Sequence, residues 1–523
     1  MFVNVEAIFH PLIQIMEFDV LKDLVQVITR NKVKQIEVLG NPGNEGSRVE
    51  EFYQMLSDGQ LQSEEEAVQH FFKTDNVKDK NYRKLRNKLI RQLINTSFFV
   101  DINQPMFDDR TKAQYNCYRD FAAAYILLTR EARRAGVYLL HQVLEQAIKY
   151  EFIDLCAEIT RYLRVTYSKA VNDAKNHQKF TQLHREYEGK RSNLIRIIDA
   201  HETLLEYYMQ KHSPSEAVYN LASGYMAEFK PLRNQMSLAQ FDYFAYSIEL
   251  IQLFSGNDIR GVAKLADEAI AALQHNPNIN RALLFNIAIQ KMSALAQLKG
   301  ANEEKILLTI NQCLGFTDEG RYNWFVVWHV AIYCYAHHKL YEKAYEAYIT
   351  GYKHERFHLQ SVRMQEEWRL LGAYLHLLVE LGELPASEVE VVTGPFKVAK
   401  FENDFVELPR DKDGMNIPIV ILPAVYALAK SDFEAFEAQI DKLDKYRKRY
   451  LETELNQRSA RFLQMMFALA KQKYGGSVRS EGRLRQEIEK LYALTPQVAR
   501  QNFAIEVIPY ENLWELLVKK LES

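Results

Sequence analysis

Proline is absent from two long stretches of this chain, residues 106–213 and 278–384. Proline lacks a backbone donor and clashes with the preceding turn, so it ends or kinks a helix. Apolar residues recur at helical spacing in both stretches, and no segment keeps up the alternation typical of a β-strand. In the first stretch glycine occurs only at Gly136 and Gly189. Helix therefore follows helix, and the predicted fold class is all-α.

Composition narrows the class of protein. At about 150 residues per domain, a chain of 523 residues corresponds to about three domains or to one long repeat array. The net charge of −2 gives no global attraction to nucleic acid or to an anionic membrane. The four cysteines are widely spaced and form no CxxC pair, as expected in a reducing compartment. The first residues lack the features of a signal peptide, and no apolar run is long enough to span a membrane. We expect a cytoplasmic protein.

Breaks in the helical pattern divide the chain into four segments. Residues 1–110 are expected to form a mostly helical accessory domain, and residues 111–212 a region of long helices, with 177–212 as one unusually long helix. Residues 213–384 alternate helix-sized segments with short breakers at a spacing of about 35–45 residues, which is typical of helical repeats. Residues 385–523 continue these repeats, with an irregular insertion near 389–418. Ser63 and Ser213 are the clearest predicted helix N-caps.

Histidine and cysteine cluster at His329, Cys334, His337 and His338. On a helix, Cys334 and His338 share a face, which suggests a metal site. A structural zinc site normally needs four protein ligands and a catalytic one three, and no further ligand follows at helical spacing. We therefore favour packing for Cys334 and a position near solvent at the helix end for His337 and His338. No metal and no cofactor is predicted.

The same stretch, "WHVAIYCYAHHKLYEKAYEAYITGY" from residue 328 to 352, carries large and small residues where two antiparallel helices pack. Ala344 and Gly351 supply the small residues of the second helix. The large positions are Trp328 and Tyr335 in the first helix, Tyr341 at the turn and Tyr348 in the second helix. The stretch resembles a tetratricopeptide repeat, with one matching unit near 324–357.

The match departs from the repeat pattern in two places. The large–small pair at Ala331 and Ile332 is reversed, and Arg356 replaces the proline that usually ends a unit. Neighbouring segments match only in hairpin length and in a loose pattern of small and aromatic residues. The resemblance implies an antiparallel helix-hairpin solenoid with a concave groove, and it implies no particular ligand.

A basic helix is the strongest local candidate for a binding surface. Residues 78–91 hold seven Lys or Arg residues and one Asp. Tyr82, Leu85, Leu89 and Leu93 form its apolar face. The candidate contacts for phosphate or for an acidic partner are Lys80, Arg83, Lys84, Lys88 and Arg91. The favoured interpretation is an ordinary solvated helix face, and a second basic patch at 444–452 is interpreted in the same way.

Enzyme motifs do not appear. The glycine loop "LGNPGNEGSR" at 39–48 has neither P-loop nor dinucleotide-binding spacing, so we interpret it as a turn, with Arg48 as the residue to test for phosphate binding. The leading hypothesis is a non-enzymatic scaffold that binds a protein or peptide in a helical-repeat groove. The alternative is a nucleic-acid-associated regulator that uses helix 78–91. An enzyme with a motif-free active site ranks third.

Overall fold

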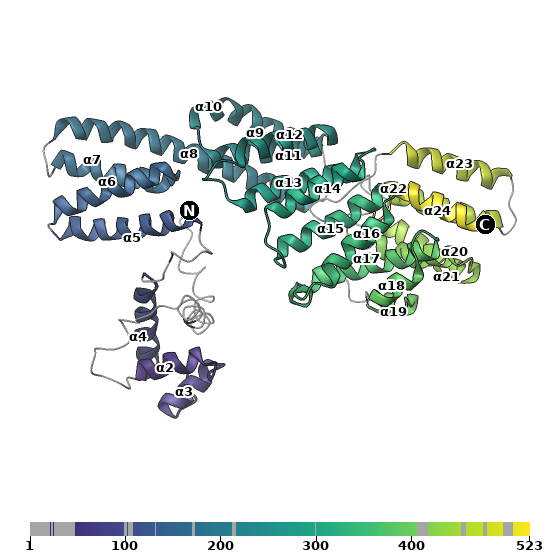
Figure 1. Cartoon of the computed structure of the whole chain (residues 1–523), viewed down its shortest axis with the longest axis horizontal. Helices are drawn as coiled ribbons and strands as arrows, with labels where there is room; N and C mark the ends of the chain where they lie inside the picture. Colours follow the sequence, from purple (N-terminus) through teal and green to yellow (C-terminus); the bar gives the residue numbers. More distant parts are fainter. Residues whose placement is uncertain are drawn as a thin grey trace. The chain divides into compact units, whose positions relative to one another are not determined.

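The computed structural model describes residues 48–98, 108–130, 132–169, 173–211, 216–298, 300–404, 417–450, 457–473, 478–494 and 506–522, together with Leu21, Val25 and Ile102. Every regular element in these ranges is a helix (Figure 1), so the predicted all-α class is confirmed. The chain divides into two compact units, Met1–Tyr187 and Glu188–Ser523. A finer division into four segments stays a prediction. The glycine loop at 39–47 and the Ser213 cap lie outside the described residues.

The first helices described in full in unit 1 are α2 (Arg48–Ser57), α3 (Glu64–Phe72) and α4 (Lys80–Ser97). Phe52, Val68, Tyr82, Leu89 and Leu93 meet in their shared core. The predicted cap at Ser63 is confirmed, because its hydroxyl accepts from the backbone N–H of Glu66 at 3.2 Å. The Glu66 carboxylate in turn accepts from the backbone N–H of Gln62 at 2.7 Å, one residue earlier than in the usual capping box.

The other described helices of unit 1 are α5 (Asp109–Thr129), α6 (Arg133–Lys149), α7 (Ile153–Lys169) and the first part of α8 (Ala174–Lys211). Consecutive helices pack against each other from α5 to α7. The ring of His184 lies 3.1 Å from the carbonyl oxygen of Ala157 and so connects α8 to α7. At 38 residues, α8 confirms the single long helix predicted over 177–212.

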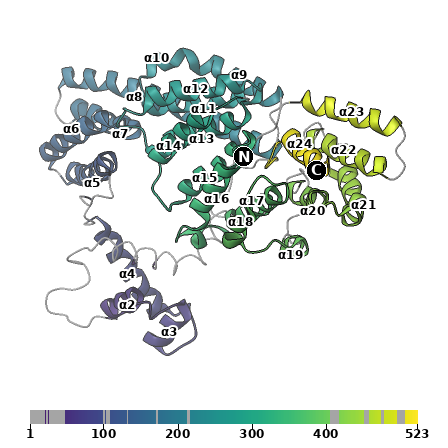
Figure 2. The same ribbon diagram turned by 45° about the vertical axis from the view of Figure 1, so that its right-hand side comes forward.

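Unit 2 is a succession of helix pairs. Its first helices are α9 (Glu216–Phe229), α10 (Arg233–Met236), α11 (Ala239–Ser255), α12 (Ile259–Leu273), α13 (Arg281–Gln297), α14 (Glu303–Gly315), α15 (Tyr322–His337), α16 (Tyr341–Tyr352) and α17 (Val362–Glu380). From α11 to α17 each helix packs against the next in antiparallel pairs (Figures 1 and 2), and α13 also packs on α15. Side-chain caps at Asp258, Asn280, Asn302 and Ser361 start four of these helices. One continuous hydrophobic core runs through the pairs.

The chain continues with α18 (Ala386–Thr393), α19 (Val398–Asp404), α20 (Ile417–Ala429), α21 (Phe433–Tyr450), α22 (Gln457–Lys473), α23 (Val478–Tyr492) and α24 (Tyr510–Glu522). The insertion predicted as irregular near 389–418 therefore contains two short helices, and residues 405–416 lie outside the described part. Val389 and Phe401 are buried in the core of unit 2. Burial of these two side chains stabilises helix where the sequence predicted an irregular segment.

Candidate functional site

Cys334 and the two histidines at the end of α15, His337 and His338, contact other parts of the fold. Cys334 is fully buried. The Nε2 atom of His337 lies 2.8 Å from the carbonyl oxygen of Glu506, and that of His338 lies 2.9 Å from the carbonyl oxygen of Leu295. The predicted position of His337 near solvent is wrong, because the segment that leads into α24 covers this end of α15 and leaves His337 only 9% exposed. Among the described residues, no group of three His, Cys, Asp or Glu side chains is arranged to hold a metal ion.

The residues assigned to repeat packing lie between α15, α16 and α17. Tyr335, Tyr341, Ala344 and Tyr348 are buried, and Trp328 is half-buried. Gly351 faces Trp368 of α17 so closely that a Cβ atom at position 351 would overlap the indole ring. The small residue at 351 therefore lets the end of α16 approach α17.

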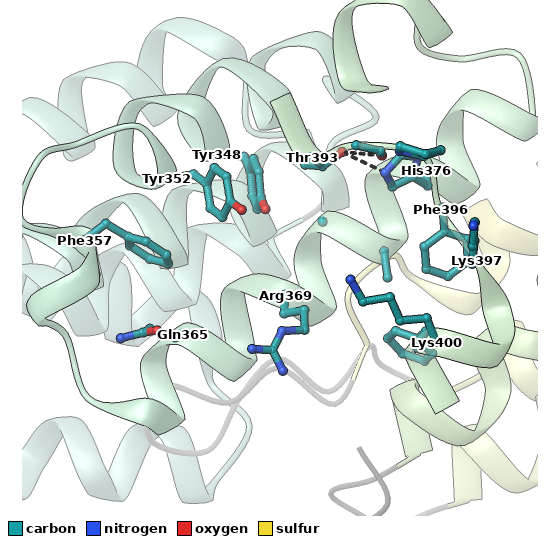
Figure 3. Close-up of a pocket in the computed structure, with 15 residues that line it drawn as sticks. Tyr348, Tyr352, Phe357, Gln365, Arg369, His376, Thr393, Phe396, Lys397 and Lys400 are labelled. Atoms are coloured by element: carbon teal, nitrogen blue, oxygen red, sulfur yellow. Dashed lines mark hydrogen bonds between the residues drawn. The ribbon is translucent and has the colours of Figure 1, made fainter. Parts of the chain in front are cut away.

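Beside this contact the structure contains a cavity of about 290 Å³. It lies between the end of α16, the outer side of α17 and the α18–α19 segment (Figure 3). Five aromatic residues line it: Tyr348, Tyr352, Phe357, Phe396 and Phe401. The rings of Tyr348 and Tyr352 stack at 5.2 Å between centroids, and Tyr352 lies 5.2 Å from Phe357. One side of the cavity is therefore aromatic, whereas other lining residues are polar or charged.

Three cations also line the cavity: Arg369 from α17, Lys397 before α19 and Lys400 within α19. All three residues are exposed. In Figure 3 the amino end of Lys400 extends toward the side of the cavity where Arg369 lies, whereas the guanidinium of Arg369 points away from Lys400. Like charges that face the same space repel each other, and an anion between them removes that repulsion.

The carboxylates of the surrounding helices pair with other cations. Glu367 accepts from Arg363 at 3.3 Å, and Glu402 pairs with Lys442 at 2.7 Å. Glu380 lies 3.3 Å from Lys430 and also accepts from the hydroxyl of Tyr426 at 2.9 Å. Within the described ranges, no ion pair involves Arg369, Lys397 or Lys400. The cavity thus carries positive charge that these carboxylates do not neutralise by contact.

His376 forms a neutral part of the wall. Burial lowers the pKa of its imidazole, and the ring stacks on Phe396 with 5.4 Å between centroids. The Thr393 hydroxyl donates to the carbonyl oxygen of Val389 at 2.8 Å, so it accepts from Nε2 of His376 at 2.7 Å. The histidine therefore positions the end of α18 and adds no charge to the cavity at neutral pH.

The second cationic surface lies on α4 in unit 1. Lys80, Arg83, Lys84, Lys88 and Arg91 are all exposed, on the face opposite the buried Tyr82, Leu89 and Leu93. Arg86 differs from them, because it is buried and pairs with Glu64 of α3. No ion pair between described residues involves the five exposed side chains. We call these five residues the α4 basic face.

The other basic candidates are weaker. In the patch at 444–452, Asp444 pairs with both Arg447 at 2.9 Å and Lys448 at 2.6 Å, which neutralises much of the local charge. Arg48 is exposed at the start of α2, and its guanidinium lies 5.7 Å from the ring centroid of Phe72.

Sequence reasoning did not find the cavity. Arg369, Lys397 and Lys400 come from different elements, and no spacing rule connects α17 with α19. The available signal was the run "PFKVAKF" at 395–401, where aromatic and basic residues alternate in a segment that showed no clear helical pattern.

Comparisons of the chain with protein-family models, with curated proteins and with solved structures gave no match. Within the described residues, none of the helices combines the length and the apolar character needed to cross a membrane.

Proposed function

We propose that this protein is a non-enzymatic scaffold, built as a tetratricopeptide-like helical solenoid, that binds a segment of a partner protein at the cavity between α16, α17 and α19. The observation that carries the proposal is the cavity itself, which combines an aromatic wall with three cations that lack carboxylate partners among the described residues. Consecutive helix pairs expose such surfaces on a rigid frame, as in other repeat proteins.

The size of the cavity sets what it can hold. Small-molecule sites usually occupy about 300–1,000 Å³, and this cavity, at about 290 Å³, lies at the lower limit. A volume of this kind accommodates one or two side chains of an extended segment rather than a folded surface. We further propose a reducing, cytoplasmic setting, which agrees with four free and buried cysteines.

Co-purification of the tagged full-length chain, compared between variants, tests the scaffold function. We expect Lys397→Glu combined with Lys400→Glu to lose at least one stoichiometric partner that the unaltered chain retains. The matched control is Lys305→Glu combined with Lys445→Glu, because both lysines are exposed on other helices of unit 2. A set of partners identical in all three samples would contradict the proposal.

A second candidate function is association with nucleic acid through the α4 basic face. Its support is the exposure of all five cations on one side of one helix. Each phosphate contact releases counterions, so binding must weaken steeply as salt rises. We expect Lys84→Glu combined with Arg91→Glu to abolish binding of a double-stranded DNA probe at low salt. Binding that is unchanged by these substitutions, or absent from the unaltered chain, would exclude this function.

A further inference from the structure

We propose that the cavity binds an internal acidic peptide segment, with carboxylates between Arg369, Lys397 and Lys400 and with a neighbouring aromatic side chain against the tyrosine and phenylalanine rings. The proposal rests on the scaffold function and specifies the chemistry of the segment that the scaffold takes.

The sign of the ligand's charge follows from the charges of the residues around the cavity. Three cations line it. Of the nearby carboxylates, Glu367, Glu380 and Glu402 are engaged with other cations, and Glu390 acts electrostatically on His376. Burial keeps His376 neutral, so it neither adds to nor offsets this charge. The ligand therefore carries negative charge, and more than one negative group is needed to match three cations.

Charge alone does not account for specific binding. An ion pair open to water contributes about 0–1 kcal/mol, and Arg369, Lys397 and Lys400 are all exposed. The aromatic rings supply a second contribution to the binding free energy. Apolar surface that the ligand and the rings remove from water contributes about 25 cal/mol per Å². Tyr352 and Phe357 are half-buried and line the same cavity. A ligand that combines carboxylates with an aromatic side chain uses both contributions.

Tyrosine hydroxyls lie on the aromatic side of the cavity. A Cβ atom on Gly372 would lie 2.8 Å from the hydroxyl oxygen of Tyr348, so the glycine lets this hydroxyl pack closely against α17. In Figure 3 the hydroxyls of Tyr348 and Tyr352 point the same way, toward the space in front of α17. Tyr348 is almost fully buried, whereas Tyr352 is half-buried, so the Tyr352 hydroxyl can donate to a carboxylate that enters the cavity.

The shape of the site favours a peptide over a nucleic acid. Proteins that bind single-stranded nucleic acid use a groove that follows the backbone, with bases stacked in succession. Here the three cations surround one cavity, in which the aromatic residues already contact one another. A side chain presented by an extended peptide fits this arrangement better than a run of phosphates.

Fluorescence anisotropy with the full-length protein tests the proposal. The probe is a fluorescein-labelled peptide with two glutamates on each side of one phenylalanine, amidated at its C-terminus so that no terminal carboxylate is present. Matched probes replace the glutamates by glutamine or the phenylalanine by alanine. We expect both matched probes to bind about tenfold or more weakly, because each loses one of the two contributions.

Variants place the binding at the cavity. Arg369→Gln combined with Lys400→Gln is expected to weaken binding of the acidic probe about tenfold or more. Lys305→Gln combined with Lys445→Gln should leave it unchanged, and circular dichroism checks that all variants keep their helices. No binding of the acidic probe, equal binding of the glutamine probe, or equal effects of the two double variants would overturn the proposal. Displacement of the probe by single-stranded DNA or by inorganic phosphate, at concentrations matched in charge, would overturn it in favour of a phosphate-bearing ligand.

The two proposals fail in different ways. If cavity variants lose a partner in co-purification but the acidic probe does not bind, the scaffold function stands and the ligand class is wrong. If the acidic probe binds at the cavity but no partner is lost, the site exists and the scaffold function is wrong.

Discussion

Gly351 and Gly224 both lie inside helices of unit 2, but their surroundings differ. A Cβ at Gly351 would overlap the buried indole of Trp368, whereas a Cβ at Gly224 would meet no atom within 4 Å. Gly351→Ala is therefore expected to lower the free energy of unfolding by about 1–3 kcal/mol, as overpacking does. Gly224→Ala is expected to raise it by up to about 1 kcal/mol, because alanine favours helix. Urea unfolding of both variants measures the difference, and effects of the same sign would contradict the packing assigned to Gly351.

The buried His329 and the half-buried Glu367 form a pair that is neutral over part of the pH range. Burial raises the pKa of the Glu367 carboxyl to about 7 and lowers that of the His329 imidazole to about 4. Their closest atoms, Nε2 and Oε2, are 3.6 Å apart, too far for a hydrogen bond. Between these two pKa values the carboxyl is protonated and the imidazole is uncharged, so the contact is not an ion pair there.

Because burial raises the pKa of Glu367, its contribution to the stability of the fold depends on pH. The unfolded chain releases the carboxyl proton near pH 4.5, whereas the folded chain keeps it up to about pH 7. The contribution of Glu367 to stability is therefore largest below pH 4.5 and falls as pH rises to 7. Glu367→Gln should gain stability relative to the unaltered chain as pH rises from 5 to 8 in thermal melts. The exposed Glu355→Gln serves as the control, and parallel pH profiles of all three proteins would refute the assignment.

At the scale of single residues, the sequence predicted the packing positions that depend on spacing within one helix hairpin. Tyr348 and Gly351 were identified as packing positions because a helix hairpin brings them together over a few turns. His337 was misplaced because its partner Glu506 is 169 positions away in the chain. Arg369 and Lys400 were missed for the same reason, since contacts between separate helices leave no periodic pattern.

At the scale of elements, Arg458 connects three helices near the end of the chain. This buried residue of α22 donates through Nε to Glu506 at 2.6 Å and through Nη2 to Glu511 of α24. Its Nη1 donates to the carbonyl oxygen of Leu494, just after α23, at 2.6 Å. Burial raises the pKa of Glu506, and Arg458 opposes that change. The guanidinium thus donates hydrogen bonds to two buried carboxylates and to the backbone carbonyl that follows α23.

Substitution of Arg458 should weaken the packing of α24 against the rest of unit 2. Arg458→Met leaves the buried carboxylates of Glu506 and Glu511 unpaired, which costs about 3–5 kcal/mol. We expect lower thermal stability and faster amide hydrogen exchange in α24 than elsewhere in unit 2. Arg461→Met is the matched control, because Glu487 keeps its contact with Lys490 at 3.1 Å. Equal exchange rates for α24 in both variants would show that Arg458 does not hold this helix.

Element boundaries were predictable where caps or long periodic runs mark them. Ser63 begins α3 and the periodic run from 177 forms α8, as expected. The segment 386–404 was not predicted as helix, because its valines favour extended chain and its burial depends on α17 and α20. Tertiary packing outweighed local propensity there.

At the scale of the whole molecule, the tryptophans allow the two units to be observed separately. Trp324, Trp328, Trp368 and Trp514 are the four tryptophans of the chain, and all belong to unit 2. Tryptophan fluorescence therefore reports on unit 2, whereas far-ultraviolet circular dichroism reports on the helices of both units.

Unit 1 and unit 2 should not unfold in one cooperative transition. Chains with several compact units, and arrays stabilised by contacts between neighbouring repeats, depart from two-state behaviour. The described core around α2–α4 contains far fewer buried side chains than the continuous core of unit 2. We expect the circular dichroism signal to start decreasing at a lower urea concentration than the one at which tryptophan fluorescence starts to change. Superimposable transitions would show instead that both units unfold together, and Lys84→Glu combined with Arg91→Glu on the exposed face of α4 should shift neither curve.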